Sequence, residues 1–109
     1  MPCGRRPRGT VMTQPIETDQ LQVLERPETG RFELDFPGGQ AFAIYRSDGD
    51  RIIVTHTEVP PAFNGRGLGS QLAEGIFRIA RASGRRVVPR CSFVADWARR
   101  HPDYGDVLA

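Results

Sequence analysis

The spacing of apolar residues changes once along this 109-residue chain, at Pro60-Pro61, and the change limits the folds open to it. Before the prolines, apolar and polar residues alternate, which is the period of a strand with one buried face. After them, apolar residues recur every three or four positions, as in an amphipathic helix. Because a chain of this length forms one small domain, the helix must pack on the strands that precede it.

The alternating half predicts antiparallel strands joined by tight turns. Pro, Gly, Asn, Asp and Ser mark such turns, and they cluster at residues 37–39 and 47–50. The strands are expected at residues 31–36, 40–45 and 51–59, with a further short strand at 20–24 that pairs with them.

The second half predicts helix, strand and helix. The long helix begins at Gly67 and ends at Ser83-Gly84, where glycine supplies the left-handed cap conformation. A strand at 86–89 and a helix at 93–100 follow, the helix with Phe93, Val94 and Trp97 on its core face. The fold class is therefore α+β, with a mixed, mostly antiparallel sheet, two main helices and the order β-β-β-α-β-α.

All 15 basic residues are arginine, which excludes a Schiff-base lysine and a lysine P-loop. Three of them lie in residues 1–11, so the rest of the chain holds 12 arginines against 13 acidic residues. Nucleic-acid binders carry a basic excess or a basic face, and no apolar run here is long enough to cross a bilayer. We expect neither a nucleic-acid partner nor a membrane.

The two cysteines, Cys3 and Cys91, have no spacing that builds a disulfide framework or a metal site, so we expect no metal. Residues 1–11 lack the apolar stretch of a secretory signal. We interpret them as a disordered leader or a misassigned start before Met12, followed by a single domain at 12–109 in the cytoplasm.

Three glycines, Gly65, Gly67 and Gly69, stand between the last strand of the first half and the long helix. They allow the backbone to turn tightly beside the free amides of the first helical turn, which suits a phosphate or pyrophosphate. Arg66 could add a side-chain contact. Glycine spacing alone is equally consistent with a plain connection.

Three side chains are candidates for chemistry. Cys91 lies between a strand and a helix N-terminus, a position that lowers a thiol pKa and favours a nucleophilic thiolate, although a lone cysteine is more often a small core residue. His56 and Glu58 share one strand face and could take a proton from an ammonium substrate; a solvated strand face is the competing interpretation.

The chain resembles the GNAT superfamily of N-acetyltransferases. The family pattern Gln/Arg-x-x-Gly-x-Gly/Ala falls on Asn64, Gly67 and Gly69, with a departure at Asn64. More narrowly it resembles the small, single-domain YjdJ-like group. That resemblance rests on His-Thr-Glu-Val-Pro at 56–60, Gly-Arg-Gly-Leu-Gly-Ser at 65–70, Val-Val-Pro-Arg-Cys-Ser-Phe-Val at 87–94 and His-Pro-Asp-Tyr at 101–104.

The resemblance implies a three-layer α/β arrangement with the sheet splayed at Val59 and the pantetheine of acetyl-CoA in the cleft. It implies that the pyrophosphate lies on the amides of residues 65–70. The cofactor-binding residues are then Val59, Asn64, Gly65, Arg66, Gly67, Leu68, Gly69 and Ser70. The tyrosine that many members carry on the last helix is missing, since its position falls near Arg99, and in the YjdJ-like group a cysteine at the place of Cys91 is the suggested catalytic residue.

The function expected from these features is an acetyl-CoA-dependent N-acetyltransferase. The Val59 amide would stabilise the oxyanion, and Glu58 or His56 would help to remove the proton of the amine. The chain lacks the N-terminal elements that usually build an acceptor pocket, so the acceptor is a small-molecule, peptide or protein amine at an open site. We expect a monomer or a weak homodimer. The alternatives are a non-catalytic sensor or interaction module that binds CoA or acyl-CoA, and a bare anion-binding domain.

Overall fold

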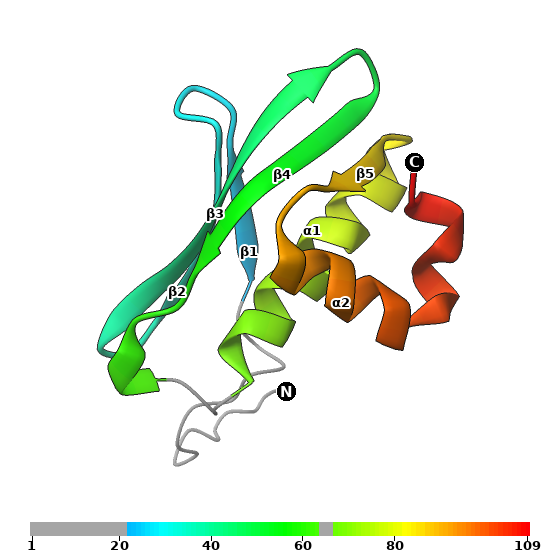
Figure 1. The fold of residues 1–109 in the computed structure, drawn as a ribbon. Helices are drawn as coiled ribbons and strands as arrows, with labels where there is room; N and C mark the ends of the chain where they lie inside the picture. The colour runs from blue at the N-terminus through cyan, green and yellow to red at the C-terminus, as the bar shows by residue number, and fades with distance from the viewer. Residues whose placement is uncertain (1–21, 64–66) are drawn as a thin grey trace, which may run out of the picture.

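The computed structural model describes residues 22–63 and 67–109 and contains a five-stranded sheet in the order β1-β2-β3-β4-β5 (Figure 1). The first four strands are antiparallel, and β4 and β5 are parallel with α1 as the crossover between them. The elements are β1 (Val23–Arg26), β2 (Arg31–Phe36), β3 (Gly39–Asp48), β4 (Arg51–Glu58), η4 (Pro61–Phe63), α1 (Leu68–Ser83), β5 (Arg86–Pro89), α2 (Ser92–Arg100) and η5 (Pro102–Val107).

This architecture confirms the α+β class and the mixed, mostly antiparallel sheet. The helix α1 begins after Gly67 and ends at Gly84, whose φ of 71° is the left-handed cap expected of glycine. One strand must be added to the predicted order, because β1 is a full member of the sheet. It lies at Val23–Arg26 rather than at 20–24, a range that falls partly outside the described residues.

The hydrophobic core lies on one face of the sheet. Alternate residues of β2 and β3, such as Phe32, Leu34 and Ala43, are buried there beneath α1. The helix α2 packs beside α1 on the same side, with the Trp97 ring stacked on Phe77 at 5.3 Å between centroids (Figure 1). The third layer expected from the resemblance is not found among residues 22–63 and 67–109, where the opposite face leaves Ile44 40% exposed.

The pairing between strands β4 and β5 ends at Val54. Their pairing runs from Arg51–Arg86 to Val54–Pro89, and β4 then continues to Glu58 paired with β3 alone. The amide of Arg90 makes the last regular ladder bond to the Val54 carbonyl, and the next amide, of Cys91, donates to the same oxygen, both at 3.0 Å, so the chain turns away from β4. The gap that was expected at Val59 therefore opens five residues earlier.

The longest described helix has 16 residues, and no described helix is both long enough and apolar enough to cross a bilayer.

A carboxylate on β1 links this strand to β3 and to the turn between α1 and β5. Glu25 accepts two hydrogen bonds from Arg85, at 2.9 and 2.7 Å, and one from the Tyr45 hydroxyl at 2.5 Å. Bidentate pairing of this kind is both strong and directional. The Arg85 guanidinium holds the pKa of Glu25 below its ordinary value, whereas burial and the Glu25 carboxylate raise the pKa of Tyr45 to about 12.

From the hydrogen bonds among Glu25, Tyr45 and Arg85 we predict that the folded protein loses stability at alkaline pH. Because the folded protein keeps the Tyr45 phenol neutral, its contribution is complete below the ordinary pKa of 10 and is lost as pH rises toward 12. The denaturant midpoint of the wild type should fall over this range, and that of Tyr45→Phe should fall less. Equal slopes for the two proteins would contradict the assignment.

Gly75 allows α1 to lie close against β1. A Cβ built at Gly75 would come within 2.5 Å of the Cβ of Val23, a carbon fixed to the β1 backbone. We predict that Gly75→Ala destabilises the protein by about 1–3 kcal/mol through overpacking, despite the better helix propensity of alanine. Gly105→Ala, where the added carbon meets nothing within 4 Å, is the matched control in urea unfolding. A stabilised Gly75→Ala variant would show that β1 moves freely.

Candidate active site

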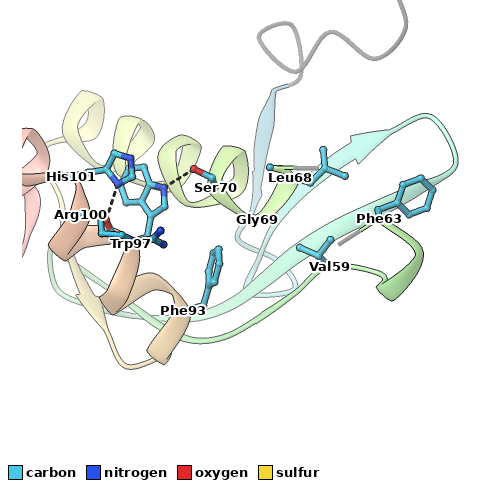
Figure 2. A pocket seen from close by; sticks show the side chains of 10 residues that line it. Val59, Phe63, Leu68, Gly69, Ser70, Phe93, Trp97, Arg100 and His101 are labelled. Atoms are coloured by element: carbon cyan, nitrogen blue, oxygen red, sulfur yellow. Dashed lines mark hydrogen bonds between the residues drawn. The ribbon is translucent and has the colours of Figure 1, made fainter. Parts of the chain in front are cut away.

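A cavity of about 250 Å³ lies where the first turn of α1 meets the end of β4 and one side of α2 (Figure 2). Gly67 adopts φ 77° at the start of α1, and no acidic residue stands in the first turn. The first amides of a helix have no partner within it, so those of Leu68, Gly69 and Ser70 are suited to an anion. The residues that line the cavity are Val59, Phe63, Gly67, Leu68, Gly69, Ser70, Phe93, Trp97, Arg100 and His101.

Five of the eight predicted cofactor-binding residues, Val59 and residues 67–70, thus line one cavity. Val59 is half-buried and packs against the core just beyond the end of β4. Asn64, Gly65 and Arg66 lie outside the described residues. The site assignments themselves remain predictions.

The helix α2 supplies a wall of the cavity that sequence reasoning missed. Phe93 was assigned to the core face, and that assignment is wrong. Its ring is 38% exposed and lies against Gly69, where a Cβ would approach it within 2.8 Å. The core face of α2 is formed by Val94, Trp97 and Ala98, and Phe93 lies at the edge of this buried stripe.

The Trp97 side chain connects this wall to α1. Its indole donates to the Ser70 hydroxyl at 2.8 Å, and the His101 ring stacks on it at 3.9 Å between centroids (Figure 2). The Nδ1 atom of His101 also lies 2.8 Å from the Trp97 carbonyl oxygen. These contacts hold the two walls of the cavity together.

Cys91 lies beside the parting of β4 and β5. It precedes the first residue of α2, and its sulfur lies 3.3 Å from the Thr57 hydroxyl. Burial opposes ionisation of the thiol, but the Thr57 hydroxyl and the amides of Val94 and Phe93 together lower the pKa of Cys91.

His56 and Glu58 point to the opposite face of the sheet. They are paired with Ile44 and Phe42, which lie on the face away from the helices, and His56 Nε2 is 3.1 Å from Glu58 Oε1. Both side chains are more than half exposed. Their common face is as predicted, whereas Cys91 contacts the core-side residue Thr57. The three candidates thus flank the unpaired edge of β4 from its two faces.

A bulge at Thr55 explains why Thr57 was missed. Tyr45 pairs with Val54, but the next pair is Ile44 with His56, so Thr55 is an extra residue. Val54 and Thr57 therefore share the core side although they stand three apart. Strict alternation does not allow this, and the run of β-branched residues carries no mark of the bulge.

Comparison with known proteins places this geometry in a family. The family model of the GCN5-related N-acetyl-transferases matches residues 31–107. The chain belongs to this family. Among solved structures it is similar to the NMR solution structure of a GCN5-like protein from Staphylococcus aureus, with 25% sequence identity and a TM-score of 0.63. That match covers 82% of this chain and 88% of the other.

From the contact between Cys91 and Thr57 we predict how the pKa of the Cys91 thiol depends on the Thr57 hydroxyl. Thr57→Val removes the hydroxyl and should raise the pKa of Cys91, because fewer hydrogen bonds would then offset the effect of burial on the thiolate. Alkylation by iodoacetamide should become slower at neutral pH, with its pH profile displaced upward. Thr55→Val is the matched control, since the Thr55 hydroxyl contacts the Ile44 carbonyl instead. If the pH profiles of alkylation were identical for Thr57→Val and Thr55→Val, the Thr57 hydroxyl would not lower the pKa of Cys91.

Proposed function

We propose that the protein is an acetyl-CoA-dependent N-acetyltransferase whose acceptor is an amine presented to the open face of the sheet. The observation that carries the proposal is the parting of β4 from β5 directly beside the first turn of α1. Membership of the GCN5-related family supports an acetyltransferase, and its acyl donor would occupy the cavity.

The residues around the cavity suit CoA in charge and shape. The amides of Leu68, Gly69 and Ser70 would hold the pyrophosphate, with no first-turn carboxylate to repel it. The edge of β4 beyond Val54, free of β5, would hold the extended pantetheine arm through backbone hydrogen bonds. When bound, acetyl-CoA supplies an acetyl thioester whose carbonyl carbon an amine attacks, with release of the CoA thiol.

Groups of the chain itself would accept the proton of the amine and stabilise the carbonyl oxygen. Glu58 and His56, joined at 3.1 Å, would accept the proton of the ammonium group directly or through water. The Val59 amide would donate to the carbonyl oxygen, and one such donor contributes on the order of 3 kcal/mol. Val59 lines the cavity just beyond the end of β4, and Glu58 and His56 lie on the last residues of β4 with their side chains on the opposite face of the sheet.

Two routes are open to Cys91. A thiol with a lowered pKa can accept the acetyl group and pass it to the amine, or it can line the thioester pocket while transfer occurs directly. The first route leaves an acetylated protein and the second does not.

The experiment begins with calorimetric titration of the protein with acetyl-CoA, followed by intact mass after free ligand is removed. Binding with a gain of one acetyl group, absent in Cys91→Ala, would support the covalent route. Binding without a mass gain would favour direct transfer. Absence of binding near 1 mM, a very weak affinity, would overturn the proposed function.

The base assignment is tested by removing both candidates. His56→Ala/Glu58→Gln should lower kcat toward an amine panel by about 100-fold or more and flatten its pH profile, as expected when a general base is lost. Arg46→Ala is the control, because Arg46 is an exposed residue of β3 outside the cavity. An unchanged rate and pH profile in the double variant would exclude this pair as the base.

A further inference from the structure

We propose that Arg100, at the end of α2, is a second ligand for the phosphate groups of CoA, facing the amides of α1 across the cavity. The inference rests on the proposed function and extends it, because it makes α2 a determinant of donor specificity. Among the ten described residues that line the cavity, Arg100 is the one with a permanent charge (Figure 2).

The position of Arg100 follows from the contacts of Trp97. The Trp97 indole donates to Ser70 in the first turn of α1, so this side of α2 faces the α1 amides. Arg100 stands three residues later, and residues three apart lie on the same side of a helix. The guanidinium and the helix N-terminus are therefore on opposing walls of one cavity.

The charge of Arg100 is only partly compensated. Its Nη2 atom lies 3.2 Å from Asp96 Oδ2, while the other oxygen of the same carboxylate lies 2.7 Å from Arg99. One carboxylate thus serves two guanidinium groups, and the group of three keeps one net positive charge. Asp96 positions Arg100 without neutralising it.

A cation facing helix amides gives a phosphate donors from two directions. Charge-assisted hydrogen bonds from arginine suit phosphate oxygens better than neutral donors do. S-acetylpantetheine has the same thioester and no phosphate. The chain should therefore bind CoA in preference to S-acetylpantetheine, and part of that preference should depend on Arg100.

The test compares two ligands and two neighbouring arginines. Arg100→Ala should weaken CoA binding about tenfold to 150-fold, the range for loss of one charge-assisted hydrogen bond, and should leave S-acetylpantetheine binding unchanged. Arg99→Ala is the matched control, since Arg99 shares Asp96 but does not line the cavity. Calorimetry measures CoA, and the NMR shift of the Trp97 indole proton follows the weaker ligand.

Two additional arms separate charge from packing. Arg100→Lys should recover part of the CoA affinity, because the charge returns without the planar fork. Dephospho-CoA distinguishes the two phosphate sources. If Arg100→Ala still weakens its binding, the contact is with the pyrophosphate, and if not, with the 3′-phosphate. Circular dichroism of each variant verifies folding.

The contrary outcomes are distinct. Equal CoA affinities for Arg100→Ala and Arg99→Ala would overturn the inference and leave the proposed function intact. Equal losses for CoA and S-acetylpantetheine in Arg100→Ala would also overturn it, because Arg100 would then act by packing. A wild-type protein that binds no CoA would end the proposed function and this inference together.

Discussion

The arrangement of the whole site depends on the hydrogen bonds of a single carbonyl group, that of Val54. The amide of Arg90 donates to it as the last regular bond of the ladder, and the amide of Cys91 donates to the same oxygen, so the chain turns away from β4 while β4 continues. The same turn places Cys91 at the N-terminus of α2 and leaves the last residues of β4 with β3 as their one neighbouring strand in the described part of the chain. The end of the pairing between β4 and β5 thus brings the cavity wall and the free edge of β4 next to each other.

The free edge also separates two kinds of chemistry. On the helix side, Cys91 and Thr57 lie among groups that favour a thiolate. On the other side, His56 and Glu58 are exposed on a face that carries no helix in the described part of the chain. An acyl donor and an amine acceptor can therefore approach the same strand from opposite faces. This division is consistent with direct transfer as well as with a relay through the cysteine.

Local rules were sufficient for most of the fold and for part of the site. The end of α1 at Gly84 and the limits of β5 follow from cap chemistry and turn residues, which act within a few positions. The contact between Cys91 and Thr57 does not, because it depends on a bulge that moves Thr57 to the core side. The position of Phe93 could not be predicted either, because the ring lies at the edge of the buried stripe of α2 and packs against Gly69. Local sequence carries no signal for either.

The outer edge of β5 is already occupied by the chain itself. Leu108 forms a parallel bridge with Val87, and the amide of Ala109 donates to the Val87 carbonyl at 3.0 Å. An exposed strand edge is a template for pairing with another chain, so these two residues compete with any incoming strand. Self-association through sheet edges would have to displace them or use β1, at the far end of the sheet. Leu108 and Ala109 therefore hinder edge-to-edge aggregation at β5.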